Sequence, residues 1–364
     1  MEQISWWRIK FGDAEIAKIT QAVQREQISQ GPIAEEFESK FASMLKVKHA
    51  ISTTSGSTAL YLTLFAMGVG PGDEVIIPDR TWIATAHAAY MLGAKVVLVD
   101  TLSNTPVINV DHVEKCITKK TKVIMPVHVN GRACDLERLK ALAQKHNIKI
   151  VEDAAQAMFS KSNGCYLGTT SDAGCFSFAM SKLISTGQGG MVVTNDNTLA
   201  KKLKLIKNHG VIDNFTDTWN QPGINFKFTD ILASIGLVQL DRVSKHIDHM
   251  MAIYEMYEQG LKDCQGIKLC PVAVDKGEHP LWVEATCQER DRLISFLRER
   301  NIQSRPSSPP LHTSDYFKSD GVYPNATYFA QKNLILPCGP DQPLVNVEKV
   351  ISAVKEHELS LSTV

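Results

Sequence analysis

The stretch KVIMPVHVNGRACDLERLKALAQKHNIKIVED, residues 122–153, decides the fold because it alternates strand and helix patterns. The apolar runs 122–129 and 148–153 are short and rich in Val and Ile, and residues 136–147 place their apolar side chains at helical spacing. Short continuous apolar runs that alternate with helices are typical of a parallel sheet covered on both faces. The stretch therefore predicts an α/β fold with a mostly parallel sheet.

The alternation continues on the N-terminal side of this stretch. Further strands and helices are expected at 74–78, 85–93, 95–100 and 111–117. From about residue 246 the pattern changes to a long helix followed by shorter elements. We therefore expect a large domain over residues 1–245, with an N-terminal helical lead-in, and a smaller α+β domain over 246–364.

Composition limits the possible partners. Lys plus Arg and Asp plus Glu both number 39, so no net positive charge is present to hold nucleic acid or an anionic membrane. The eight cysteines are scattered, without a CxxC pair or a His cluster at metal-ligand spacing, which favours free thiols in a reducing compartment. The N-terminus lacks a signal-peptide apolar core, and no run reaches membrane-spanning length. We expect a cytoplasmic protein without a metal site.

Two polar positions lie where the predicted sheet would hold a ligand, because ligands of such sheets bind at the carboxyl ends of the strands. Gly56, Ser57 and Thr58 begin a predicted helix, whose free N–H groups attract an anion; Ser or Thr there can also simply cap the helix. Asp153 ends an apolar strand, where a carboxylate is costly unless it meets a cation; it can equally cap the next helix. Each position has a functional and a structural interpretation.

Lys182 lies in the stretch CFSFAMSKLISTGQGGMVVTND, residues 175–196, between two apolar runs. The ordinary interpretation is an ammonium group that extends from a strand end to solvent. The functional interpretation is a nucleophile whose pKa is lowered by desolvation. A helix N-terminus for a phosphate, an acid for a pyridine nitrogen and a lysine for a Schiff base are what pyridoxal 5′-phosphate (PLP) requires. Together, the three features predict a PLP site.

A series of motifs resembles the DegT/StrS-type nucleotide-sugar aminotransferases, which have the aspartate-aminotransferase fold (PLP fold type I). The motifs are SGSTALYLTL, GPGDEVIIPDRTWIATAHAA, GAKVVLVD, TKVIMPVHVNGRACDLERL, IVEDAAQA, FSFAMSKLISTGQGGMVVTND, KNHG, GINFKFTDILASIGLVQL and LILP, in the family's order and spacing. The resemblance covers nearly the whole chain. It implies a PLP-dependent aminotransferase that alternates between the PLP and pyridoxamine forms of its cofactor.

The resemblance assigns four residues to the cofactor ring. Lys182 matches the Schiff-base lysine, and Asp153 matches the partner of the pyridine nitrogen. Gln156 matches the residue that hydrogen-bonds the ring's 3′-oxygen, and Trp82 matches the aromatic residue stacked on the ring. From the residues alone, Gln156 would be a solvated helix residue and Trp82 a core aromatic.

The resemblance also assigns the cofactor phosphate. Gly56, Ser57 and Ser177 match its contacts within one subunit. Asn225 matches an asparagine that reaches the phosphate of the neighbouring subunit, although it could simply hold a turn. The match implies a homodimer with shared active sites.

Other positions concern the substrate. Gln188 and Lys227 stand where the family usually has Glu and Arg, and the segment 301–317 carries Ser-Ser-Pro-Pro where bulkier aromatic residues are expected. Arg305 and His312 flank this segment's PSSPP, and we expect them to bind the substrate diphosphate, because the chain has no net charge to attract it. The alternative interpretation is that Arg305 is a solvated residue at a strand end and His312 a loop histidine.

The expected reaction is transfer of an amino group from an amino acid, expected to be L-glutamate, to a nucleotide-linked keto-sugar in amino-sugar or polysaccharide (O-antigen-like) biosynthesis. A 4-keto-6-deoxy hexose is expected because it is frequent in the family. The alternatives are a 3-keto sugar nucleotide or another small keto or phosphorylated substrate. A PMP-dependent sugar dehydratase of this fold has histidine in place of the lysine, whereas this chain keeps Lys182. A non-catalytic regulator would have little reason to keep together the four residues Lys182, Asp153, Gln156 and Trp82.

Overall fold

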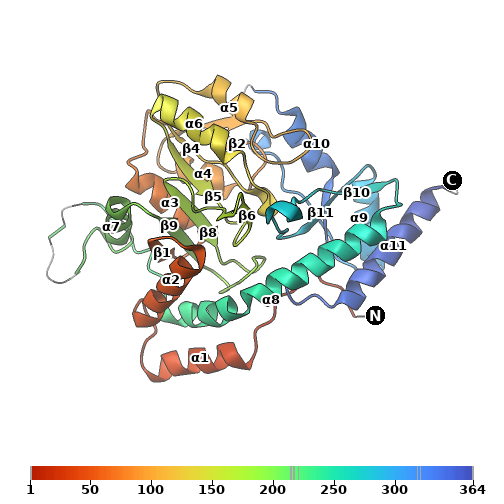
Figure 1. Cartoon of the computed structure of the whole chain (residues 1–364), viewed down its shortest axis with the longest axis horizontal. Coiled ribbons are helices and arrows are strands. Elements are labelled where there is room, and N and C mark those ends of the chain that lie inside the picture. Colours follow the sequence, from red (N-terminus) through yellow and green to blue (C-terminus); the bar gives the residue numbers. More distant parts are fainter. Residues whose placement is uncertain are drawn as a thin grey trace.

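The alternating apolar runs form a seven-stranded sheet inside the larger part of the molecule, on the left in Figure 1. The structure is a computed structural model that describes residues 2–213, 215, 218–219, 221–317, 319 and 321–362. The strand order is β1-β9-β8-β5-β4-β2-β3. The strands are β1 (His49–Thr53), β2 (Glu74–Pro78), β3 (Lys95–Val99), β4 (Thr121–Ile124), β5 (Lys149–Asp153), β8 (Ala173–Ser177) and β9 (Gly190–Thr194). Within this sheet β9 alone runs antiparallel to its neighbours, which confirms the predicted mostly parallel sheet.

Helices cover both faces of the sheet because successive strand residues point to opposite sides. On β2, Val75 and Ile77 pack with α3 and α4, while Ile76 faces α5 and α6. On β8, Phe176 packs under α2, in a cluster with Phe37. The helices around this sheet are α1 (Asp13–Gln24), α2 (Pro32–Leu45), α3 (Gly56–Ala66), α4 (Ala84–Tyr90), α5 (Val110–Cys116), α6 (Leu136–His146) and α7 (Asn197–Ile206).

The expected strand over 122–129 is shorter in the structure. Strand β4 ends at Ile124, and the chain then makes only isolated contacts with its neighbours. Pro126 lacks the N–H that a central ladder needs, although its carbonyl still accepts from the N–H of Asp153. The strand therefore ends where the ladder loses a donor.

The C-terminal part contains a four-stranded antiparallel sheet in the order β10-β11-β13-β12. Its elements are β10 (Ile267–Leu269), β11 (Val283–Cys287), α9 (Arg290–Glu299), β12 (Arg305–Pro306), α10 (Pro324–Lys332), β13 (Asn333–Leu336) and α11 (Leu344–Ser362). β6 (Lys161–Ser162) and β7 (Cys165–Tyr166) form a separate two-stranded antiparallel sheet. The mixture of helices and an antiparallel sheet is the α+β character expected of the smaller domain.

Helix α8 (Asp230–Leu261) joins the two sheets as one continuous element (Figure 1). The Asp230 carboxylate accepts hydrogen bonds from the N–H groups of Gly31 and Ala34, so it caps α2 as well as beginning α8. The proposed boundary at 245/246 falls inside this helix. The division into 1–245 and 246–364 stays a prediction.

The N-terminal residues lie against the C-terminal part of the chain. Ile4 forms a bridge with Ile302, and Trp7 forms one with Cys338. The residues before α1 therefore contact the C-terminal part, while Trp7 also donates from Nε1 to the Met180 carbonyl of the large part.

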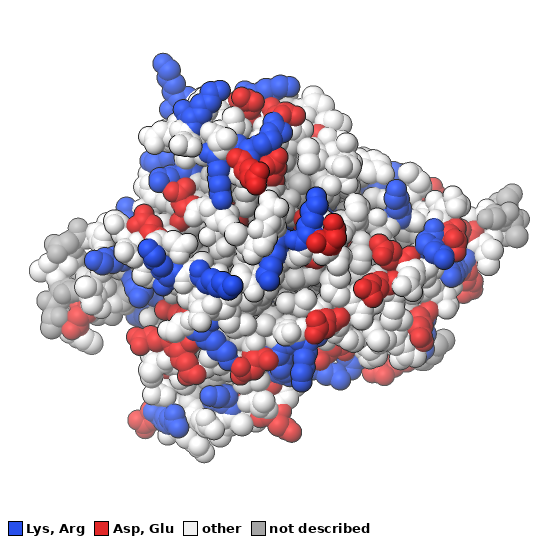
Figure 2. All heavy atoms as spheres, in the orientation of Figure 1, with Lys and Arg blue, Asp and Glu red and all other residues white. Residues whose placement is uncertain are grey.

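Acidic and basic side chains are interspersed on the surface shown in Figure 2, without an extended region of one sign. In the described ranges, no helix combines the length and apolar character needed to cross a membrane. The same ranges contain no cluster of three or more His, Cys, Asp or Glu side chains that could hold a metal ion.

Candidate active site

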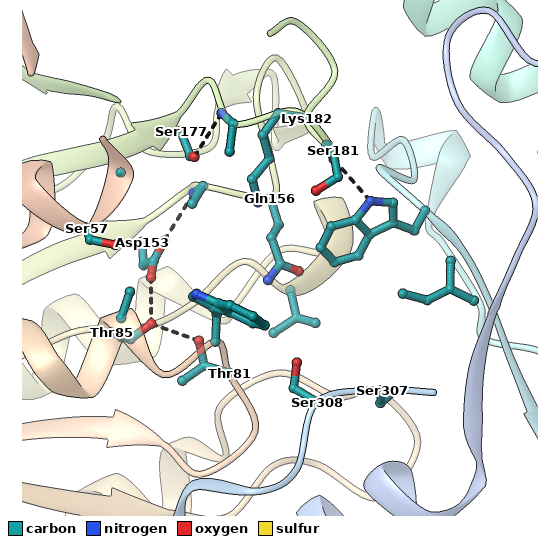
Figure 3. Close-up of a pocket in the computed structure, with 18 of the residues that line it drawn as sticks. Ser57, Thr81, Thr85, Asp153, Gln156, Ser177, Ser181, Lys182, Ser307 and Ser308 are labelled. Carbon is teal, nitrogen blue, oxygen red and sulfur yellow. Dashed lines mark hydrogen bonds between the residues drawn. The ribbon is translucent and has the colours of Figure 1, made fainter. Parts of the chain in front are cut away.

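A pocket of about 530 Å³ opens at the carboxyl ends of β2, β5 and β8, and the C-terminal part of the chain closes its other side. Figure 3 shows Lys182, Gln156 and Asp153 on one side and Ser307 and Ser308 opposite them. The lining comes from both parts of the chain and includes Ser55, Gly56, Ser57, Arg80, Trp82, Thr85, Asp153, Gln156, Ser177, Lys182, Gln188, Trp282, Glu284, Arg305, Ser307 and Ser308. The strand ends thus bring together residues that are far apart in the sequence.

Asp153 is a buried carboxylate at the end of β5. Its Oδ2 accepts a hydrogen bond of 2.8 Å from the Thr85 hydroxyl, and its Oδ1 accepts one of 3.1 Å from the N–H of Ala155. Burial raises the pKa of Asp153, while these two hydrogen bonds and the charge of Lys182 act in the opposite direction. The site holds an acid that a cationic partner would stabilise in its ionised form.

Lys182 follows β8 and extends its half-buried side chain into the pocket (Figure 3). Its Nζ lies 5.2 Å from the centre of the Trp282 ring. Burial lowers the pKa of the amine to about 8, and the negative charge of Asp153 offsets part of that effect. At neutral pH a fraction of this amine is therefore uncharged and nucleophilic.

The N-terminus of α3 provides an anion cradle. The Ser55 side chain accepts from the N–H of Thr58, which leaves the N–H groups of Gly56 and Ser57 without a partner inside the helix. Ser177, at the end of β8, lies against this turn: a Cβ added at Gly56 would be 2.8 Å from the Ser177 Cβ. Ser55 therefore caps the helix, and the first two N–H groups remain for a ligand, so phosphate binding at this turn stays a prediction.

Gln156 and Trp82 both line the pocket but differ in how the protein holds them. The Gln156 Oε1 accepts a hydrogen bond of 3.0 Å from the N–H of Asn130, which leaves its NH₂ group for the pocket. Asn130 also bonds the backbone of Trp282, so it ties this wall to the C-terminal part. Trp82 is 61% exposed and lines the pocket, so it is not the core aromatic that its residue type alone suggested.

Two predicted residues lie outside the described lining of the pocket. Asn225 is exposed, forms a bridge with Asn208, and accepts from the N–H of Lys227. This position leaves its expected contact with a neighbouring subunit as a prediction. His312 places its Nδ1 2.6 Å from Asp79, and its backbone N–H donates to the same carboxylate. His312 is therefore held by Asp79, and its expected contact with the substrate diphosphate stays a prediction.

Arg305 lines the pocket mouth. Its side chain is exposed, and its guanidinium lies 5.6 Å from the centre of the Trp6 ring. The position suits a contact with a charged substrate, and the diphosphate role stays a prediction.

Sequence reasoning missed Thr85, Arg80 and Glu284. Thr85 lies in the first turn of α4, three residues after Trp82, so its place at the start of the predicted helix could have indicated it. Arg80 follows a fully buried strand, and Glu284 interrupts the apolar stretch LWVEATC; the reasoning that singled out Asp153 applied to both.

The pocket fits PLP on observations of this chain alone. The α3 N–H groups and the Ser177 hydroxyl would receive the phosphate, Asp153 the protonated ring nitrogen, and Lys182 the aldehyde. The NH₂ group of Gln156 and the ring of Trp82 would hold the remaining ring positions. The fold and the site together define a PLP-dependent enzyme with the aspartate-aminotransferase fold.

Comparison with known proteins narrows this class. Residues 10–355 match the DegT/DnrJ/EryC1/StrS aminotransferase family, and the chain belongs to this family of PLP-dependent sugar aminotransferases. It is 40% identical over 290 residues to the GDP-perosamine synthase of Caulobacter vibrioides, which covers 78% of each chain. The structure of DesV from S. venezuelae matches with a TM-score of 0.90 at 33% identity over 94% of each chain. A putative sugar aminotransferase from Streptococcus pneumoniae, solved in its PLP form, matches with a TM-score of 0.93 at 27% identity over 99% of each chain.

Proposed function

We propose that this sugar aminotransferase transfers the amino group of L-glutamate to a nucleotide-linked 4-keto-6-deoxy hexose. The observation that carries the proposal is the Lys182 amine, whose pKa burial lowers to about 8, in one pocket with the buried Asp153. The relative named GDP-perosamine synthase supports a nucleotide-sugar acceptor, because its name denotes the synthesis of a GDP-linked amino sugar. Amino-sugar or polysaccharide biosynthesis is the corresponding role.

The residues divide the work between positioning and proton transfer. PLP supplies an aldehyde that takes up the amino group and a ring that draws electrons from the carbon being deprotonated. The Asp153 carboxylate would keep the ring nitrogen protonated, and Thr85 and Ala155 hold that carboxylate in place. The Lys182 amine, partly neutral at pH 7, would move a proton at the donor or acceptor carbon as general base and acid.

The test is a panel of nucleotide-linked 3-keto and 4-keto sugars. The purified PLP-loaded protein is incubated with L-glutamate and each sugar, and the products are identified by mass spectrometry. We expect an amino sugar from a 4-keto substrate and none from the Lys182→Ala variant. Turnover by Lys182→Ala, or amination of 3-keto sugars alone, would refute the assignment of the lysine or of the carbon position respectively.

We also propose that the enzyme is a cytoplasmic homodimer. Its eight cysteines are all free thiols, as expected in a reducing compartment. The segment that carries Asn225 also exposes large apolar side chains, including Phe215 and Trp219, which suits burial against a second copy. Sedimentation should give a dimer at micromolar concentration, and Asn225→Ala should weaken PLP retention. A fully active monomer would exclude the shared site.

A further inference from the structure

A buried cluster of two guanidinium groups and one carboxylate adjoins the pocket. Arg80 Nη2 lies 2.8 Å from Glu284 Oε1, and Arg132 Nη1 lies 2.7 Å from Glu284 Oε2. All three side chains are at most 7% exposed. The two arginines depress the pKa of Glu284 to about 2, so the carboxylate is ionised at neutral pH. The cluster therefore carries one more positive than negative charge in a place that water scarcely reaches.

The excess charge belongs to Arg80 because Arg132 is fully engaged. Besides Glu284, Arg132 donates from Nε to the Pro271 carbonyl at 2.8 Å and from Nη2 to the Cys270 carbonyl at 3.1 Å. These bonds fix the chain before β11, which is a structural role. Arg80 has weaker support: a 3.3 Å hydrogen bond to the Ser307 hydroxyl and a Phe329 ring 5.4 Å away. Its Nε has no hydrogen-bond partner among the described residues.

Arg80 and Ser307 both line the pocket, and Ser307 and Ser308 lie across from Lys182 and Gln156 (Figure 3). The small serine side chains leave room beside the guanidinium. A buried cation without its own counter-ion is costly, and an anion bound beside it removes that cost. The geometry thus places on the pocket wall an arginine that shares its one counter-ion, Glu284, with Arg132.

We infer that Arg80 binds a carboxylate of the amino donor. The inference rests on the proposed function and extends it by naming the group that holds the donor. A carboxylate is favoured over the acceptor's diphosphate because Arg80 is buried, whereas the exposed Arg305 stands at the mouth. The donor must bring its α-carbon to Lys182, so its carboxylates enter the buried part of the pocket. A carboxylate beside the guanidinium would add a charge-assisted hydrogen bond to those that Arg80 Nη2 already donates to Glu284 and Ser307.

The test measures binding without turnover. Glutarate carries the two carboxylates of glutamate but no amino group, and glutaramide is its uncharged analogue. Calorimetry on the PLP-loaded enzyme should show that glutarate binds more tightly than glutaramide. Arg80→Met should weaken glutarate binding roughly 10- to 150-fold and remove the difference between the two compounds, since a charge-assisted contact is lost. Arg138→Met, which removes an exposed guanidinium paired with Asp111, is the control and should bind glutarate normally.

The melting temperatures of Arg80 variants show whether Arg80 binds a ligand or only holds the two parts of the chain together. In the Arg80→Met variant Glu284 still forms its ion pair with Arg132, so we expect a melting temperature close to that of the unaltered protein. If that variant does not fold, Arg80→Gln, which keeps a donor for Glu284, should show the same loss of glutarate binding. Unchanged glutarate binding in a folded Arg80 variant would overturn the inference and leave Arg80 as a structural contact.

The half-reactions distinguish this inference from the proposed function. Loss of the glutamate half-reaction, with the reverse reaction of the amino sugar spared, supports the donor site. The opposite result would overturn it and assign Arg80 to the sugar. Glutarate binding that depends on Arg80 while every keto-sugar fails as an acceptor would retain the donor site and refute the proposed acceptor.

Discussion

Removal of the Asp153 carboxylate should make Lys182 more reactive in the cofactor-free enzyme. Burial lowers the pKa of Lys182 to about 8 from the ordinary 10.5, and the negative charge of Asp153 works against this shift. In Asp153→Asn the opposing charge is gone, so the pKa of Lys182 should fall below about 8. A lower pKa means a larger neutral fraction at pH 7.

The expected magnitude follows from the two pKa values. With a pKa of about 8, roughly one amine in ten is neutral at pH 7, against roughly one in three thousand for an ordinary lysine. Lys182 should therefore present roughly 300 times more neutral amine than it would at its ordinary pKa. The Asp153→Asn variant can raise the rate at pH 7 by at most roughly tenfold more, because the neutral fraction cannot exceed one.

The assay is limited acetylation of the cofactor-free protein between pH 6 and pH 11. Mass spectrometry of the digest follows the peptide that contains Lys182, and the exposed Lys46 in the same sample corrects for the reagent. The labelling midpoint of Lys182 should lie near pH 8 and move lower in Asp153→Asn. A midpoint near 10.5, or an upward shift in the variant, would refute the reasoning about burial and the neighbouring charge.

A second outcome for Asp153→Asn and the outcomes of three further substitutions can be stated. Asp153→Asn should nearly abolish transamination while the circular dichroism spectrum is retained, because an amide does not stabilise a charged ring nitrogen; an active variant would contradict this role. Thr85→Val should move the acid limb of the pH–rate profile to higher pH. The Thr85 hydrogen bond lowers the pKa of Asp153, so its loss raises that pKa. Gly56→Ala should weaken PLP binding in an absorbance titration, because its Cβ would lie 2.8 Å from the Ser177 Cβ; unchanged affinity would show that the turn can move. Arg305→Ala should raise the KM for the nucleotide sugar roughly 10- to 150-fold and spare the glutamate half-reaction; equal damage to both would reassign the residue.

The part of the site that follows from strand order was predictable from the sequence. Asp153 and Ser177 each end a parallel strand, and Lys182 follows shortly after, so a doubly covered sheet must place all three at one edge. The glycine-led start of α3 reaches the same edge because it follows β1. These placements depend only on local patterns and on the chirality of strand–helix–strand units.

The remaining residues depend on contacts between distant segments. Arg80 and Glu284 are separated by 204 residues, and their pairing requires the two sheets to be placed relative to each other. The His312 side chain was expected to face a substrate, yet the buried Asp79 carboxylate, whose pKa burial raises, lies within 2.6 Å of it. A buried carboxylate needs a hydrogen-bond donor, and no local sequence pattern shows which loop supplies that donor.

The continuous helix α8 also determines where the polypeptide can be cut. Buried residues occur along its whole length, from Ala233 near one end to Leu261 at the other, so a break at 245/246 would sever hydrogen bonds and expose apolar surface on both fragments. The turn at 262–266 lies between α8 and β10, and its residues are exposed except for the half-buried Cys264. Two co-expressed fragments divided within 262–266 keep the helix whole, and reassembly of the protein from separate pieces should therefore succeed there and fail at the centre of the helix.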